Sequence, residues 1–346
     1  MSSPGEEQTP QVTDEDGWWG QLYDGAGTDT GRTRRADTLD DRFRSATSVT
    51  RGAAVPQSVP EPPPATERAQ LPEADPERLA DLVPDTVLDG ATYGAVTLRA
   101  ASVRGEEHRT AGRPRGDALL TARFGDRPDT GLLLFTVATG DAGTPFGHRA
   151  AREVCRTLGA AVGRSHARLA EDIRGERRGA LLSGLQRLTD RVYGRLRAQA
   201  EAFGVAPERY SAGLRCLLVP ADPRCRTRIC FGVGEGGLFR LCDGTWDDID
   251  PARAGDAPFR FRAVEALPGD VLVLCSPGFA APLRDGMESG PAPGVTGAGY
   301  GGFARERAEE WSEAASPPGL APFLTQVGAR PEQWPGDRTV AAVWER

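Results

Sequence analysis

The segment GLLLFTVATGDAG, residues 131–143, passes from an unbroken apolar run into a glycine-rich turn. A continuous apolar run bounded by turn residues predicts a strand that is buried on both faces. Loops that follow such strands commonly carry functional groups. Here Thr139 ends the strand, and the nearest acid, Asp141, follows two positions later. Three interpretations of the turn are therefore open: a metal site without its acid, a displaced metal site, or only a turn.

Apolar runs on both sides of this segment predict the rest of the fold. Strands are expected at 91–105 and 117–125 before it, and two helices follow it, the first over 147–173. In the second helix, apolar residues recur at steps of three and four from Leu181 to Leu196, which indicates one buried face. Further strands are expected at 211–220, 226–234, 237–244, 269–276 and 337–345, with short helices at 305–314 and 319–328. This order is typical of an α+β fold with helices packed on a sheet core.

Composition divides the 346-residue chain into two parts. Pro, Glu, Asp, Ser, Thr and Gly dominate residues 1–88, a composition that cannot build a core, so this part is predicted to be a disordered tail. Residues 1–90 carry 18 acidic and 8 basic residues, which leaves 31 acidic and 34 basic residues for the remainder. Residues 89–346 are predicted to form the folded domain.

An aromatic island, DGWWGQLYDG at residues 16–25, interrupts the tail. Trp18, Trp19, Leu22 and Tyr23 are costly to leave in water, so they are candidates for docking in a groove of a protein partner or of the folded domain. A chance aromatic cluster explains the same residues. In a related hypothesis, the island does all the binding and the folded part only presents it, which deletion of residues 1–88 would test.

The residue composition argues against several functional classes. All 42 basic residues are arginine, so the chain has no lysine for a phosphate-binding loop or a Schiff base. Its three histidines are too scattered for a histidine metal site. The six cysteines form no C-x-x-C pair, and neither a secretory signal nor a membrane-spanning apolar stretch is found, which predicts a cytoplasmic protein. Clustered basic charge of the kind that binds nucleic acid is not evident in the sequence.

Five segments in this order resemble the type 2C (PPM) protein phosphatase family across residues 92–346: RPRGDALLTARFG, LLLFTVATGDAG, FGVGEGGLFRLCDGTW, PGDVLVLCSPGF and GDRTVAAVW. The resemblance implies a sandwich of two β-sheets flanked by pairs of helices. It also implies hydrolysis of phosphoserine and phosphothreonine by a pair of Mn²⁺ or Mg²⁺ ions that activate a bridging water. In this family, aspartates at strand ends in four motifs hold the two ions.

Transferred onto this sequence, the resemblance leaves one of the four carboxylates in place. Asp117 occupies the position of the first motif. Thr139 stands where the second motif has its metal-bridging aspartate, and Pro277 replaces the aspartate of the third. In the fourth motif Gly336 takes the aspartate position, and Asp337 follows directly after it.

These substitutions predict a pseudophosphatase, which keeps the fold but has neither the cation pair nor another metal cofactor. A single carboxylate holds a divalent ion only weakly, and two neighbouring cations repel each other. The alternative is an active, divergent Mn- or Mg-dependent serine/threonine phosphatase rebuilt around Asp117, Asp141 and Asp337. A displacement of two residues moves a carboxylate by about 6 Å, whereas coordination distances tolerate about 0.2 Å. The alternative therefore needs rebuilt turns.

The predicted role is binding in signalling, through the former cleft or through the acidic tail. Gly112 stands at the position of the family's phosphate-binding arginine, and Arg113 and Arg115 lie beside it. Because arginine can pair with phosphate through two parallel hydrogen bonds, these two arginines are candidates for holding a phosphorylated protein partner.

Overall fold

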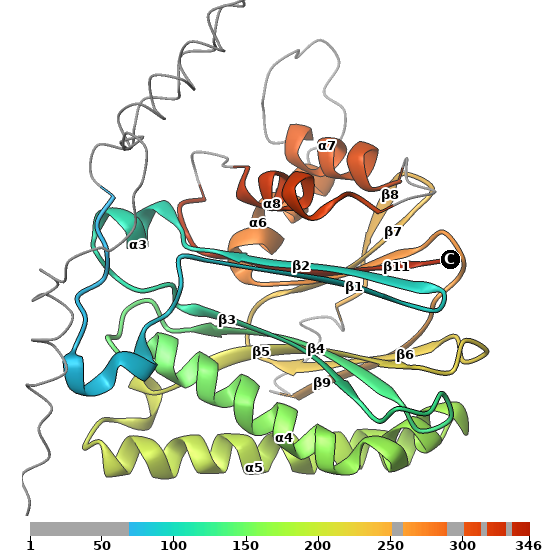
Figure 1. Ribbon diagram of the computed structural model, residues 1–346, viewed down its shortest axis with the longest axis horizontal. Helices are drawn as coiled ribbons and strands as arrows, with labels where there is room; N and C mark the ends of the chain where they lie inside the picture. Colours follow the sequence, from blue (N-terminus) through green and yellow to red (C-terminus); the bar gives the residue numbers. More distant parts are fainter. Residues whose placement is uncertain (1–68, 251–258, 289–300, 313–316, 330–333) are drawn as a thin grey trace, which may run out of the picture. The chain divides into compact units, whose positions relative to one another are not determined.

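Two antiparallel β-sheets stack face to face in the computed structural model, with helices on the outer side of each (Figure 1). The structure describes residues 69–250, 259–288, 301–312, 317–329 and 334–346. The aromatic island at 16–25, and the part of the predicted tail up to residue 68, lie outside these ranges. Every element given below belongs to one compact unit, Thr66–Arg346.

Each sheet takes its strands from distant parts of the chain. Within the described ranges, the first sheet has the strand order β1-β2-β11-β10-β7-β8, and the second has the order β3-β4-β5-β6-β9. The first sheet consists of β1 (Thr86–Tyr93), β2 (Val96–Val103), β11 (Arg338–Glu345), β10 (Val271–Cys275), β7 (Gly237–Cys242) and β8 (Thr245–Asp248). The second consists of β3 (Asp117–Phe124), β4 (Leu132–Gly140), β5 (Ala212–Pro220), β6 (Thr227–Val233) and β9 (Phe259–Glu265).

Helices cover the outer faces of both sheets (Figure 1). The long pair α4 (Gly147–Arg174) and α5 (Arg178–Ala202) covers the second sheet, and α6 (Pro277–Glu288), α7 (Gly301–Ser312) and α8 (Leu320–Gly328) cover the first. Three short helical segments complete the inventory: α3 (Glu106–Thr110), η1 (Pro76–Asp81) and η2 (Pro207–Arg209). The predicted two-sheet sandwich flanked by helices is confirmed. None of the helices in the described ranges combines the length and apolarity needed to cross a membrane.

The alternation of side chains along β4 explains why its sequence is apolar throughout. Leu133, Phe135 and Val137 point into the core between the two sheets, whereas Leu132 and Leu134 point into the core between the second sheet and the helices α4 and α5. Successive residues of a strand face opposite sides, so a strand covered on both sides needs apolar residues at every position. A third core lies between the first sheet and α6–α8, with Trp311 nearly fully buried at its centre.

Residues 69–88, which composition assigns to the tail, include η1 and the first residues of β1. The expected single strand at 91–105 is a hairpin of β1 and β2, which turns at Gly94 with a φ of +58°. Just before β1, Asp85 accepts hydrogen bonds from Arg104 at 3.0 Å and from Arg109 at 2.6 Å. Residues 69–88 have the composition of the tail, but ion pairs and the pairing of β1 with β2 hold them to the rest of the folded unit.

Helix α6 forms in a segment whose prolines and glycines have low helix propensity. Pro277 stands at the first turn, where its missing N–H needs no partner. Pro282 lies inside the helix and is buried together with Phe279, Ala280 and Leu283. Burial of this apolar face against the first sheet outweighs the weak helix propensity of the segment.

Candidate functional site

The four motif positions converge on one edge of the sandwich, at the ends of four strands. Asp117 begins β3 and is paired in register with Thr139 near the end of β4. Pro277 follows β10, and Gly336 precedes β11, which is the neighbour of β10 in the first sheet. The edge is the one beside α3 in Figure 1.

Asp117 is buried among hydroxyl groups. Thr339 Oγ1 donates a hydrogen bond of 2.8 Å to Asp117 Oδ2, and Ser102 Oγ lies 2.6 Å from the same Thr339 hydroxyl. Ser276 Oγ accepts from the backbone N–H of Thr339 at 3.0 Å, which fixes β11 beside the end of β10. The side chain of Asp117 thus faces a closed polar cluster, and Asp117 is only 2% exposed.

Burial, and after it the nearby negative charge of Asp337, raises the pKa of Asp117 to about 7. Hydrogen bonds from Ser276, Thr339 and Thr139 act in the opposite direction on this pKa, but they are the smaller effect. Near neutral pH, the carboxyl is therefore divided between its protonated and ionised forms.

Asp337 uses both carboxylate oxygens within the fold. Its Oδ1 accepts from the backbone N–H of Gly105 at 2.6 Å, and its Oδ2 accepts from the backbone N–H groups of Gly116 at 2.5 Å and Asp117 at 3.3 Å. His108 Nδ1 lies 2.9 Å from each oxygen. Asp337 therefore ties α3, the segment before β3 and the start of β11 together.

Asp141 does not join this cluster. It is exposed, and its Oδ1 accepts from the backbone N–H of Gly143 at 2.8 Å, while its carbonyl oxygen accepts from the N–H of Thr144 at 3.2 Å. These are the contacts by which an aspartate stabilises its own turn.

The two candidate arginines have different environments. Arg115 is 3% exposed, and its guanidinium donates to the carbonyl oxygens of Asp117 at 3.1 Å and Ser102 at 3.0 Å. Arg113 has a side chain that is 39% exposed; it donates to Ala142 O at 2.8 Å and to Glu107 Oε1 at 2.5 Å. Of the two, only Arg113 is accessible to a ligand from solvent.

The residues at this edge do not fit a pair of divalent cations. Thr139, Pro277 and Gly336 bring no carboxylate, and both oxygens of Asp337 are held by backbone N–H groups and His108. Within the described ranges, no three His, Cys, Asp or Glu side chains are grouped so that they could hold a metal ion. Hard cations of this kind need several oxygen ligands around each ion.

Sequence reasoning missed Ser102, His108 and Thr339. A single histidine and isolated hydroxyl residues have no characteristic spacing, so nothing in the sequence linked them to Asp117 or Asp337. Ser102 and Thr339 meet because β11 pairs with β2, and His108 reaches Asp337 from α3.

Gly278, in the first turn of α6, offers a test of how tightly this edge is packed. A Cβ added to Gly278 would stand 2.1 Å from the carbonyl oxygen of Asp337. We expect Gly278→Ala to destabilise the fold by about 2 kcal/mol or more, as overpacked sites do. Gly184→Ala in α5 is the matched control, because no atom lies within 4 Å of its added Cβ, and it should be neutral or stabilising by up to about 1 kcal/mol. Thermal melts distinguish the two, and equal melting temperatures would contradict the close approach.

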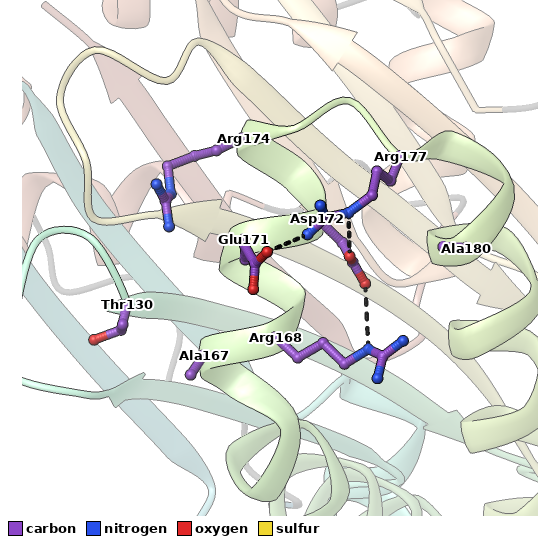
Figure 2. Close-up of a pocket in the computed structure, with 8 residues that line it drawn as sticks. All are labelled: Thr130, Ala167, Arg168, Glu171, Asp172, Arg174, Arg177 and Ala180. Atoms are coloured by element: carbon purple, nitrogen blue, oxygen red, sulfur yellow. Dashed lines mark hydrogen bonds and ion pairs between the residues drawn. The ribbon is translucent and has the colours of Figure 1, made fainter.

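A separate pocket of about 740 Å³ lies far from this edge, beside the carboxyl end of α4 (Figure 2). Its lining residues are Thr130, Ala167, Arg168, Glu171, Asp172, Arg174, Arg177 and Ala180. Arg177 Nε donates to Asp172 Oδ1 at 2.6 Å, and its Nη2 donates to Glu171 Oε1 at 2.7 Å. Since α4 begins near Asp117 and spans 28 residues, the pocket and the motif edge lie at opposite ends of a helix about 40 Å long.

Comparison with known proteins gives one family match. Residues 104–257 match the family model described as Protein phosphatase 2C. Among solved structures, PppA, described as a key regulatory component of T6SS in Pseudomonas aeruginosa, is 20% identical, with 75% of this chain and 100% of that chain covered at a TM-score of 0.46. The Mycobacterium tuberculosis serine/threonine phosphatase PstP/Ppp is 19% identical, with 72% and 99% covered at a TM-score of 0.44. No curated protein matches the chain.

Proposed function

Because residues 104–257 match the family model of protein phosphatase 2C, we propose that this chain is a pseudophosphatase, a cytoplasmic signalling protein that binds a phosphorylated protein without hydrolysing it. The observation that carries the proposal is the arrangement of Asp337, whose two carboxylate oxygens are held by three backbone N–H groups and His108. A carboxylate in this environment is a structural anchor and has no free oxygen for a cation.

The environment of Asp117 supports the same conclusion. Its Oδ2 accepts from Thr339, and the side chain is closed off from solvent. Binding of a cation here would require loss of the proton that burial favours and displacement of the Thr339 hydroxyl. We therefore propose that the protein needs no metal cofactor, and that the family's cation site has become part of the core.

Arg113 is the candidate contact for the phosphate group. Its exposed guanidinium lies at the motif edge, beside the turn that contains Asp141, and is held in place by Ala142 O. A phosphate would compete with Glu107 for the other side of the guanidinium, and the phosphate carries more charge and more acceptor oxygens than a carboxylate.

The test is a thermal melt of the full chain with and without millimolar Mn²⁺ or Mg²⁺, with turnover of phosphoserine peptides measured on the same samples. We expect no shift of the melting temperature and no turnover, and we expect peptide binding that is weakened by Arg113→Gln. Turnover that depends on the added metal and disappears in Asp117→Ala, but not in Asp126→Ala, an exposed control outside the motifs, would establish the active alternative instead.

A further inference from the structure

The helix pair on the second sheet carries a concentrated positive charge. Residues 147–202, which span α4 and α5, contain 12 arginines and 6 acidic residues. The remaining residues of the unit Thr66–Arg346 contain 24 arginines and 32 acidic residues. The folded unit is therefore divided into a basic helical layer and an acidic remainder, although its total charge is close to zero.

Most of this positive charge faces solvent. Eleven of the twelve arginines are exposed: Arg152, Arg156, Arg164, Arg168, Arg174, Arg177, Arg178, Arg187, Arg191, Arg195 and Arg197. Within the part of the chain that the structure describes, five of them have no side-chain hydrogen bond or ion pair, namely Arg164, Arg178, Arg187, Arg191 and Arg197. These five guanidinium groups are free to meet a ligand.

Ion pairing within the fold explains only part of this arrangement: Arg195 lies 3.5 Å from Glu153, whereas Arg187 and Arg191 have no such partner among the described residues. Arg187, Arg191 and Arg195 follow one another at steps of four, so they form a row on one face of α5. Like charges at this spacing destabilise a helix by about 0.2–0.5 kcal/mol for each pair. The opposite face of α5 is held in the core by Leu185, Val192 and other apolar residues, so the helix does not need the row in order to pack.

Small apolar patches lie between the charged groups. Ala167 and Ala180 line the pocket at the end of the pair, where Arg168 and Arg177 both approach Asp172 (Figure 2). Leu182, in the first turns of α5, is 41% exposed. The surface thus offers guanidinium groups together with apolar contacts. A polypeptide segment that carries acidic groups with apolar side chains between them could contact both.

We propose that the outer face of α4 and α5 binds an acidic polypeptide segment with aromatic or aliphatic side chains between its acids. A nucleic acid fits this face less well, because the exposed carboxylates of Glu171, Glu176 and Asp190 interrupt the positive charge. Tyr193, the only Phe, Tyr or Trp on the two helices, donates its hydroxyl to Ala212 O at 2.7 Å and is not available for stacking with bases. A membrane surface would require a larger apolar face.

A peptide with the required chemistry occurs in this sequence and serves as the probe. Residues 6–29 contain seven acidic residues, no basic residue, and the aromatic island with its two tryptophans. Such a peptide complements the excess of six positive charges on residues 147–202. The surface uses none of the residues at the four motif positions and does not include Arg113, so this proposal does not depend on the proposed pseudophosphatase function.

The experiment measures binding of a fluorescent synthetic peptide, residues 6–29, to the unit Thr66–Arg346, which contains both sheets and all three cores. Arg187→Glu combined with Arg191→Glu is expected to weaken binding by about tenfold or more. The matched control, Arg224→Glu with Arg305→Glu, makes the same change in charge at side chains that are 91% and 68% exposed elsewhere on the unit, and should have little effect. Circular dichroism verifies that each variant is folded, and Arg164→Glu with Arg197→Glu replaces the first pair if it is not.

Three results would overturn the proposal. The first is no binding of the peptide at low salt. The second is an equal loss in the control pair, which would indicate attraction by net charge alone. The third is tighter binding of duplex oligonucleotides or phosphatidylserine vesicles than of the peptide, with the same dependence on Arg187 and Arg191, which would assign the face to that ligand. A peptide with its acids replaced by amides should not bind.

Discussion

Asp117→Asn is expected to stabilise the protein at pH 8, although it removes the one carboxylate retained from the family's metal motifs. Asp117 has an ordinary pKa of 3.8, and burial followed by the charge of Asp337 raises it to about 7 in the folded protein. At about 1.4 kcal/mol for each pKa unit, ionisation of this buried group costs on the order of 4 kcal/mol above pH 7. Asparagine avoids this cost and keeps an oxygen that accepts from Thr339.

The sign of the effect defines its dependence on pH. When folding raises the pKa of a carboxyl, the fold is most stable while that carboxyl is protonated. The stability is fully present below the unfolded pKa and is lost as pH rises from about 4 through about 7. Asp117→Asn should therefore match the wild type near pH 4 and melt about 5–10 °C higher at pH 8. Melts of both proteins between pH 4 and pH 8 give the difference directly. A variant that is less stable than the wild type at pH 8 would show that the ionised carboxylate is favoured by its surroundings.

Asp337→Asn is expected to have the opposite effect, although the two aspartates are neighbours and the substitution is the same. Asparagine replaces one acceptor oxygen with an NH₂ group, which would face the backbone N–H of Gly105 or the N–H groups of Gly116 and Asp117. Loss of charge-assisted hydrogen bonds and an unpaired buried donor together cost about 3–5 kcal/mol. Relief of the repulsion with Asp117 offsets a small part of this loss.

Urea denaturation at pH 7 measures the effect of Asp337→Asn, with Asp141→Asn as the exposed control. The control should change the free energy of unfolding by less than about 1 kcal/mol, because only a turn hydrogen bond is affected. If Asp337→Asn were as stable as the wild type, the carboxylate would not be the anchor that the pseudophosphatase proposal requires.

The sequence predicted the fold well where burial dictates the pattern of residues. The apolar run of β4 and the periodic leucines of α5 each lie in a core, and the structure has them as a strand and a helix. Predictions were wrong where local propensity and tertiary packing conflict. Gly94 turns a run that looked like one strand into a hairpin, and α6 forms despite Pro282 because its apolar face is buried.

The candidate site was harder to predict than the fold. Asp117, Thr139 and the segment after β10 all lie at the ends of strands, and the order of the sequence segments indicated those strand ends. Their proximity could therefore be predicted. The orientation of Asp337 does not follow from the sequence, because it depends on three backbone N–H groups at the residue before α3 and at the start of β3. A shift of one position between Gly336 and Asp337 therefore changes the carboxylate from a metal ligand in the family pattern to an anchor inside the fold.

The central place of β11 has a consequence for how the protein is made. This strand joins β2 to β10. Ser102 of β2 and Thr339 of β11, whose hydroxyls meet, are 237 positions apart in the chain. A ribosome that adds about 5–20 residues each second needs about 10–50 s to cover this interval. During that time the β1–β2 hairpin has an open edge of unpaired N–H and C=O groups, which invites pairing with other chains. Production of this protein should therefore benefit from chaperones that shield nascent strands and from slow expression at low temperature.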